Sequence, residues 1–371
     1  SFSAGGYACA IADHSITVNI PFRINLDSLA AVFTTNGAGV SVGGTAQTSG
    51  TARDFNAPVV YDVTAEDGTM KSWTVTASNM GVVSTLSLST SAADENEISS
   101  PMGMTTDGAS LYIANTGLHT ILKINAPGTA PVITCFAGIQ GTAGTVNGAL
   151  RHAATFTSPR GVGFGGNKFF VAEAAADIRR ISPNLLKVQT AYSGLAGNPN
   201  AIAYDGSYIY AAINGDVYTN YTGSMTKLSA TPLGSLSSII YAGGYLYAAD
   251  SAYNCVWKIT TAGVATLFAG SGSAAIYGDA DGIGPAARFH NPQGITTDNT
   301  NLYVSDGNSM IIRKISLSTA RVRTIAGSNY SPGTSDGTGP AAQFSTPEGL
   351  AVIGTTLYVV DSASGRIRKI E

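Results

Sequence analysis

Charged residues and long apolar runs are both scarce in this chain of 371 residues. Only 12% of the residues are charged, which is about half the share that is usual in a soluble protein. The net charge is −3, so there is no electrostatic case for nucleic acid or an anionic membrane as a partner. No apolar run approaches the roughly 20 residues of a membrane span. We therefore expect neither a nucleic-acid partner nor a membrane span.

Cysteine is also scarce. Cys9, Cys135 and Cys255 form no CxxC pair and no zinc-binding spacing, which excludes covalent haem and the common zinc modules. One internal disulfide at most could form. The pairing state stays open, and a buried, inert thiol is the expectation for each. The chain begins with Ser1 instead of Met, so we expect an exported protein whose leader has been removed.

Glycine is abundant, with 44 residues, and self-similarity along the chain organises much of it. Six units share a Pro-x-Gly-like start, an apolar strand resembling Leu-Tyr-Val, an acidic or amide residue, and a basic strand. They include in turn the strands Leu111–Asn115, Phe169–Glu173, Ile209–Ile213, Leu246–Asp250, Leu302–Asp306 and Leu357–Asp361.

Short strands divided by Asp-Gly and Gly-Gly turns, repeated in this way, predict a β-propeller. The last unit stops after its third strand, and the segment 83–90 alternates apolar and polar residues. We predict that strand 83–90 pairs with the last blade, which closes a six-bladed propeller over residues 82–371 and removes two exposed sheet edges. The units resemble NHL repeats. That resemblance implies a fold but no particular activity, since propellers host many functions.

Three Gly-rich inserts precede the second, fifth and sixth units, and the last imitates two active-site signatures. Residues 333–337 spell Gly-x-Ser-x-Gly, and residues 337–342 spell Gly-x-Gly-x-x-Ala. A nucleophile elbow and a dinucleotide fingerprint both need a helix after the motif, whereas Pro340 and a strand follow here. We interpret the inserts as connections between blades, with a recurring phenylalanine filling the groove between blades: Phe156, Phe289 and Phe344.

Residues 1–79 have a different texture, with about seven short strands and no repeat. Val59–Val63 and Trp73–Thr76 alternate around Glu66-Asp67-Gly68, which predicts a hairpin. The segment resembles bacterial Ig-like or cadherin-like modules, which implies a small β-sandwich acting as a spacer or adhesive unit in an exported protein. Residues 80–81 are the expected linker. The fold class predicted for the whole chain is therefore all-β.

Candidates for chemistry are few, and we assign no catalytic, cofactor-binding or metal-ligating residue. The four histidines stand at non-equivalent places in the repeat: His14, His119, His152 and His290. Asp279–Gly282 begins like an EF-hand loop, but its twelfth position is His290 where Glu is required.

Two residue types recur with the repeat and invite a functional interpretation. The residues that end the second strands could form a ring of calcium ligands, but we favour a structural role, accepting backbone N–H bonds in turns: Asn115, Glu173, Asp250, Asp306 and Asp361. The basic residues are expected at solvated or salt-bridged strand edges, not on an RNA-binding face: Lys123, Arg179, Arg180, Lys258, Arg313, Lys314, Arg368 and Lys369.

Low charge and 17 tyrosines suit a protein that acts through contacts with other proteins, since interfaces are rich in Tyr and poor in Lys and Glu. The function predicted is a non-enzymatic extracellular or cell-surface protein. Its sharper form is self-assembly into an array or filament, with Ser1–Asp13 added to a neighbour's sheet. Two alternatives stay open: a propeller enzyme, either a metal-dependent lyase or a calcium-dependent hydrolase, and a propeller that binds a glycan or small ligand.

Overall fold

The computed structural model describes residues 1–90, 97–125, 127, 131–149, 151–185, 187–229 and 233–371. They divide into two compact units, Ser1–Gly81 and Val82–Glu371. Strands dominate both units, as the all-β prediction requires. The helices of the described ranges are 3₁₀ turns of three residues: η2 (Thr116–Leu118), η3 (Arg151–Ala153), η4 (Pro183–Leu185), η5 (Gly284–Ala286), η6 (Gly339–Ala341) and η7 (Ser362–Ser364).

The N-terminal unit holds nine strands in the order β6-β5-β8-β9-β3-β2-β1-β4-β7. The predicted hairpin is confirmed, since Val60 of β8 pairs with Thr74 of β9 and Gly68 takes a left-handed φ of 81° in its turn. Strands β3 and β9 run parallel. The strands are β1 (Phe2–Ala4), β2 (Tyr7–Ala12), β3 (Ser15–Asn19), β4 (Leu29–Phe33), β5 (Gly39–Val42), β6 (Thr45–Ala46), β7 (Thr51–Arg53), β8 (Val59–Thr64) and β9 (Met70–Ser78).

The first strand of this unit is occupied on both edges. Ser3 of β1 pairs with Ala8 of β2 on one side and with Val32 of β4 on the other. The side chains of Phe2 and Ala4 are buried in the unit's own core. Donation of Ser1–Asp13 to a neighbouring sheet, considered above, would therefore break up the donor's own unit.

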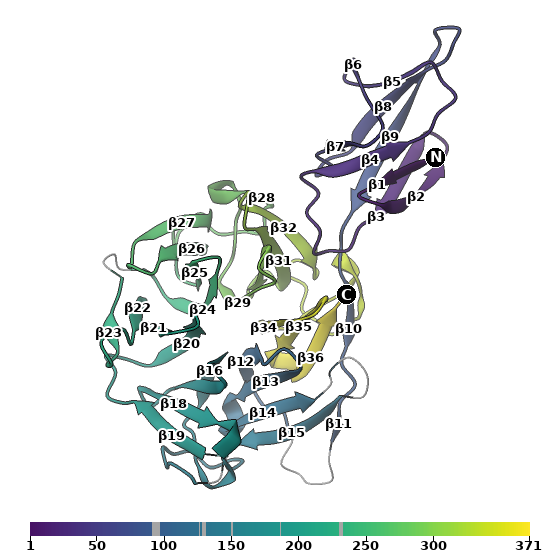
Figure 1. Ribbon diagram of the computed structural model, residues 1–371. Helices are drawn as coiled ribbons and strands as arrows, with labels where there is room; N and C mark the ends of the chain where they lie inside the picture. The colour runs from purple at the N-terminus through teal and green to yellow at the C-terminus, as the bar shows by residue number, and fades with distance from the viewer. Residues whose placement is uncertain (91–96, 126, 128–130, 150, 186, 230–232) are drawn as a thin grey trace. The chain divides into compact units, whose positions relative to one another are not determined.

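The second unit is a six-bladed propeller, as predicted (Figure 1). Each inner strand contacts the next one round the ring, including the last with the first. From the inside outward, the blades are β12 (Pro101–Thr106), β13 (Ser110–Asn115), β14 (Thr120–Asn125) and β15 (Val132–Ala137); β16 (Pro159–Gly165), β17 (Lys168–Glu173), β18 (Asp177–Ser182) and β19 (Lys187–Tyr192); β20 (Pro199–Tyr204), β21 (Ile209–Ile213), β22 (Asp216–Thr219) and β23 (Thr226–Lys227); β24 (Leu236–Ala242), β25 (Tyr245–Asp250), β26 (Cys255–Thr260) and β27 (Ala265–Gly270); β29 (Pro292–Thr297), β30 (Asn301–Asp306), β31 (Ile311–Ser316) and β32 (Arg321–Ala326); and β34 (Pro347–Ile353), β35 (Thr356–Asp361) and β36 (Arg366–Ile370).

The ring is closed from upstream by β10 (Val82–Thr85), which pairs antiparallel with β36. The segment predicted as one closing strand is nevertheless divided. Ser89–Thr90 forms β11, which runs parallel to β15 of the first blade. Leu86 marks the division, because its side chain enters the core shared by the last and first blades. The chain thereby leaves one blade for the next.

The Gly-rich inserts pass along the outer edges of their blades. Two form short extra strands, β28 (Gly282–Ile283) against β32 and β33 (Gly337–Thr338) against β10. In each insert one polar side chain joins the arginine of the third strand to a threonine of the outermost strand. Asp281 Oδ1 accepts hydrogen bonds from Arg313 (3.0 Å) and the Thr324 amide (2.8 Å). The equivalent acceptors are Asn147, with Arg179 and Thr190, and Asp336, with Arg368 and Thr85.

The expected place at strand edges is wrong for four of the basic residues, which are buried, whereas the expected salt bridges do form at three of them: the buried residues are Arg179, Arg313, Lys314 and Arg368. Arg179, Arg313 and Arg368 are fully buried, and each pairs with the acidic residue that ends the second strand of its blade. Each guanidinium also lies over the ring of the insert phenylalanine, at 5.4, 5.1 and 5.1 Å from the centroids of Phe156, Phe289 and Phe344. Phe156 and Phe289 pack in cores shared by two neighbouring blades, as predicted.

Loss of one buried arginine should therefore destabilise its blade. We expect Arg368→Ala to lower the free energy of unfolding by about 3–5 kcal/mol, because Asp361 would be left buried without its partner. Arg366→Ala, on the same strand but exposed, should change it by less than about 0.5 kcal/mol. Urea unfolding of the two variants measures the difference, and equal losses would contradict the assigned role.

Candidate functional site

The second residue of each inner strand is left out of the sheet ladder, and in three blades the glycine after it is left out as well. The register shifts just after the first residue of all six inner strands, which is a β-bulge. Bulges re-aim side chains and are common beside functional sites. The residue after the Pro (Leu236 in the fourth blade) thus belongs to a ring around the central channel, which we call the bulge ring: Met102, Arg160, Asn200, Ser237, Gln293 and Glu348.

Glycine follows four of these residues because a larger residue there would clash with the next blade. A Cβ on Gly161 would lie 2.5 Å from the carbonyl oxygen of Asn200 in the next blade. A Cβ on Gly294 would clash with the carbonyl oxygen of Glu348. Neighbouring inner strands therefore approach too closely for a side chain. The same clash with the next blade would occur at Gly103 and Gly349.

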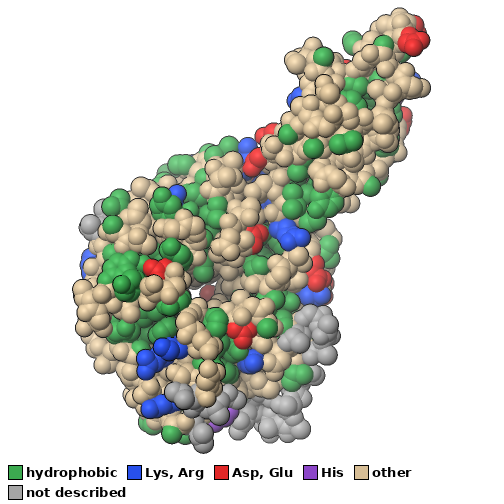
Figure 2. All heavy atoms as spheres, viewed as in Figure 1, with side chains coloured by type: hydrophobic (Ala, Val, Ile, Leu, Met, Phe, Trp, Pro, Cys, Tyr) green, Lys and Arg blue, Asp and Glu red, His purple; other side chains and the backbone are tan. Residues whose placement is uncertain are grey.

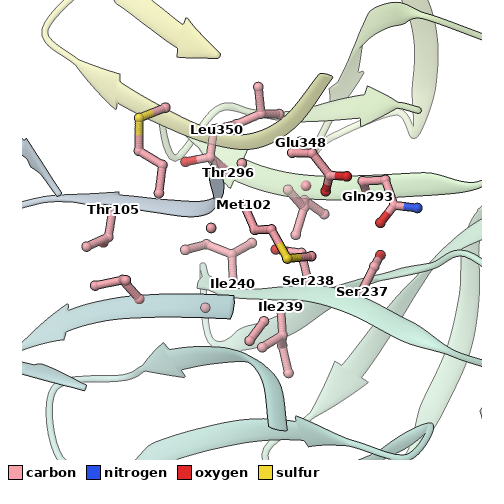
Figure 3. Close-up of a pocket in the computed structure, with 18 of the residues that line it drawn as sticks. Met102, Thr105, Ser237, Ser238, Ile239, Ile240, Gln293, Thr296, Glu348 and Leu350 are labelled. Atoms are coloured by element: carbon pink, nitrogen blue, oxygen red, sulfur yellow. The ribbon is translucent and has the colours of Figure 1, made fainter. Parts of the chain in front are cut away.

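The inner strands enclose a cavity of about 440 Å³. Figure 2 shows a hollow at the centre of the propeller on the face in view. In Figure 3, Glu348, Gln293 and Ser237 lie close together, while Met102 extends toward Ser238. Apolar residues such as Ile240 and Leu350 also line the cavity. It combines an apolar wall with a few convergent polar groups, as ligand pockets do.

Hydrogen bonds orient four members of the bulge ring. Arg160 Nη1 donates to Asn200 Oδ1 (3.0 Å), and Asn200 Nδ2 donates to the Leu236 carbonyl (3.0 Å). Ser237 Oγ donates to the Pro292 carbonyl (2.7 Å). Gln293 Nε2 donates to Asn291 Oδ1 (2.8 Å). The first three bonds cross from blade to blade, the last joins residues of the same blade, and all hold the polar groups in place before any ligand arrives.

Glu348 differs from these residues. Its carboxylate has no hydrogen bond or ion pair within the described part of the chain, and burial raises its pKa from 4.5 to about 7. A carboxyl group without a partner in a cavity is costly to keep charged. Its oxygens remain available to a ligand that donates hydrogen bonds.

The recurring acidic residues do not line this cavity. Asp306 accepts the His290 amide (2.7 Å) and Asp361 accepts the amides of Ser345 and Thr346 (2.9 and 2.7 Å). Each is fully buried. They therefore fill the structural role, but the amides they accept belong to the chain entering the blade and not only to the turn that follows. Asn115, Glu173 and Asp250 accept entering amides in the same way.

The other sequence candidates lie apart. Among the described residues, no group of three His, Cys, Asp or Glu side chains stands where it could hold a metal ion. His14 stacks on Trp73 in the N-terminal unit, whereas His119 accepts the Ser158 amide in the propeller. No disulfide forms between the cysteines, of which Cys255 is buried and Cys9 and Cys135 are partly so.

The Gly-x-Ser-x-Gly motif has no elbow geometry. Ser335 Oγ donates to Gln343 Oε1 (3.0 Å), and a two-residue strand followed by the 3₁₀ turn η6 comes after it. Arg368 binds the carbonyl of Ser335 and the side chain of Asp336. The motif therefore belongs to the insert that covers the buried arginine of the last blade.

Sequence reasoning missed the bulge ring. It sought chemistry in residues that recur, whereas the ring consists of the one Pro-x-Gly position whose residue differs in every blade. That variation, Met, Arg, Asn, Ser, Gln and Glu at matching places, was the signal that could have found it.

Comparison with known proteins agrees with this architecture. The chain is 25% identical over 292 residues to human NHL repeat-containing protein 2, covering 75% of this chain and 39% of that protein. It thus spans about two-fifths of the length of this relative and of its bovine counterpart. The NHL resemblance is confirmed at the level of homologous repeats.

Solved structures of the same build come from Bacteroides. A Bacteroides thetaiotaomicron protein of unknown function is 17% identical, with 98% of this chain and 97% of that chain covered and a TM-score of 0.63. An auxiliary nutrient binding protein from Bacteroides ovatus is 17% identical, with 93% of each chain covered and a TM-score of 0.60. A similar protein from B. thetaiotaomicron is 15% identical, with 95% and 96% covered and a TM-score of 0.62. These likenesses show the fold.

The N-terminal unit matches a family model of its own, described as SGBP, N-terminal, over residues 1–77. It is a separate β-rich domain, and its Ig-like character stays a prediction. Within the described ranges, no helix is both long and apolar enough to cross a membrane.

The isolated Glu348 carboxyl predicts a pH-dependent stability. Its pKa is raised from 4.5 to about 7 by burial, so the folded protein retains a proton that the unfolded chain loses between these values. Stability should therefore fall as pH rises through this window. We expect Glu348→Gln to match the wild type at pH 4 and to exceed it by about 1–3 kcal/mol at pH 8.

Denaturant unfolding at both pH values measures this difference. Glu97→Gln, at an exposed position, is the matched control and should show no such dependence. A Glu348→Gln variant whose advantage is the same at pH 4 and pH 8 would contradict an isolated carboxyl.

Proposed function

We propose that this protein is a non-enzymatic, exported surface protein that binds a glycan through the mouth of its propeller. Residues 80–81 link the binding propeller to the N-terminal module, which serves as a spacer. The observation that carries the proposal is the bulge ring: six equivalent positions with six different side chains around one cavity. Features that repeat in a propeller serve the blade, whereas this position does not repeat.

The chemistry of the ring suits a ligand rich in hydroxyl groups. The ring offers a guanidinium, two amides, a hydroxyl and a carboxylate as donors and acceptors. Planar amide and carboxylate groups can each contact adjacent hydroxyls, and donors held by neighbouring blades lose little freedom on binding. Met102 and the apolar cavity wall can contact the C–H face of a sugar ring.

The comparisons favour the same class of ligand. The model that matches residues 1–77 describes the N-terminal part of SGBP, that is, surface glycan-binding proteins. Two structures that share the fold are named auxiliary nutrient binding proteins. We infer a cell-surface location and a nutrient glycan as the ligand from these names together with the site.

Arg160 and Gln293 provide the test. The purified full chain is screened against an array of neutral oligosaccharides, and affinity for the best ligand is measured by calorimetry. We expect Arg160→Ala and Gln293→Ala each to weaken binding about tenfold or more, since each removes a directed hydrogen bond.

Lys168→Ala is the charge control for this test. Lys168 is exposed just beyond the opposite end of β16, so its loss should leave affinity unchanged. If no oligosaccharide binds, or if the ring variants bind like the wild type, the proposal is wrong.

Contact with other proteins, including self-association into an array or filament, is the second candidate. It is favoured by an open cavity of about 590 Å³ on the N-terminal unit, whose lining includes Phe33, Val40, Tyr61, Val63 and Trp73. An apolar groove of this kind suits a protein partner.

Val63 lies in that groove, whereas Val60 lies on the same strand with its side chain on the opposite face. If the groove mediates self-association, the wild type should form larger species at high concentration. Val63→Glu should abolish them and Val60→Glu should not. Light scattering and negative-stain microscopy of the full chain distinguish these results from well-dispersed monomers, which would exclude self-association.

A further inference from the structure

Two exposed tyrosines and a histidine form an aromatic cluster on the inserts beside the bulge ring. Tyr277 is 58% exposed and Tyr330 is 51% exposed. The rings of Tyr277 and His290, both in the insert before the fifth unit, are stacked with centroids 4.3 Å apart. The ring of Tyr330, in the insert before the sixth unit, has its centroid 6.0 Å from that of His290. Aromatic rings held in this way but left open to solvent are not core residues.

A chain of polar contacts joins this cluster to the bulge ring. Gln293 Nε2 donates to Asn291 Oδ1 (2.8 Å), and Asn291 Nδ2 donates to Asn308 Oδ1 (3.1 Å). The Asn308 amide nitrogen is in turn 3.2 Å from His290 Nε2. The path from the channel mouth to the tyrosines is therefore lined by side-chain amides.

The cluster breaks the symmetry of the repeat, as the ring does. Asn147, Asp281 and Asp336 are equivalent, since each bonds the buried arginine of its blade. The residues four positions before them are Ala143, Tyr277 and Pro332. A blade can thus be built without an aromatic residue there. The residue after the groove phenylalanine is likewise Thr157, His290 or Ser345.

Tyr330 also adopts a backbone conformation that disfavours its side chain. Its φ is 54°, in the left-handed region that costs a bulky residue about 1 kcal/mol or more. The conformation is held by a bond from its amide to the Ser309 carbonyl (3.1 Å) and by a contact between Asn329 and Asp279. Strain kept at an exposed aromatic residue points to a use for that ring.

We propose that Tyr277, His290 and Tyr330 form a stacking platform for a pyranose unit of a neutral glycan whose other end occupies the bulge ring. The apolar face of a sugar stacks on an aromatic ring, while the amides of Asn291 and Asn308 meet its hydroxyls. This inference rests on the proposed function and extends it, because it makes the site long enough to select oligosaccharides over single sugars.

Chain-length dependence tests the platform. Calorimetry on the full chain compares a disaccharide with a hexasaccharide of the neutral glycan that binds best in the array screen. In the wild type the hexasaccharide should bind at least about tenfold more tightly. Tyr277→Ala and Tyr330→Ala should each weaken hexasaccharide binding about three- to tenfold and leave disaccharide binding unchanged.

Tyr245→Ala is the matched control, since Tyr245 is 36% exposed at a turn of another blade, and it should bind both sugars normally. Tyr330→Phe keeps the ring and should retain the wild-type affinity for the hexasaccharide.

The failures are distinguishable. If ring variants lose binding but Tyr277→Ala and Tyr330→Ala bind the hexasaccharide normally, the platform is wrong and the proposed function stands. If the two tyrosine variants bind the hexasaccharide normally and instead shift the oligomeric state in light scattering, the cluster is a protein contact, which also overturns the platform. If no glycan binds the wild type, both proposals fail.

Discussion

The close approach of the inner strands is the constraint on which the rest of the propeller depends. At four of the six inner strands the backbone of one strand meets the backbone of the next with no room for a Cβ, and glycines such as those at positions 161 and 294 leave that space. The residue before each of these glycines stands in a bulge, outside the ladder. The bulge is present in all six blades, so each inner strand contributes to the ring both a close neighbour and a position whose side chain the sheet does not use.

Outside the channel, the blades are held by buried polar clamps. An arginine such as Arg313 reaches an acidic residue in its own blade, the insert that covers it, and an aromatic face. The terminal nitrogens of the guanidinium are paired with the carboxylate and with the insert, which is what makes the buried charge tolerable, although its Nε has no hydrogen-bond partner among the described residues. The Gly-rich inserts are thus parts of the blade, and their resemblance to hydrolase and nucleotide motifs follows from the glycines that their turns require.

The repeat made the all-β class, the number of blades and the fate of Phe156 and Phe289 predictable, because each follows from residues that recur with the period of the blade. Burial of Arg313 was not predictable, since the sequence does not show which insert folds over which strand. The division of 83–90 depends on where one side chain, Leu86, finds its core. The bulge ring escaped attention for the opposite reason: its members share a place but no chemistry, so a search for likeness passes over them.

Completion of the ring by an upstream strand has a consequence for the order of folding. Val83 pairs with Ile370. The ring is therefore complete only after residues from the two ends of the propeller sequence have come into contact. Five blades can form from strands that are neighbours in the sequence. The sixth forms completely only when β10 pairs with β36, which is the contact with the largest sequence separation in the propeller. Until then, β10 and β36 each present an unpaired edge, and this interval is when the chain is most open to pairing with a strand from another molecule.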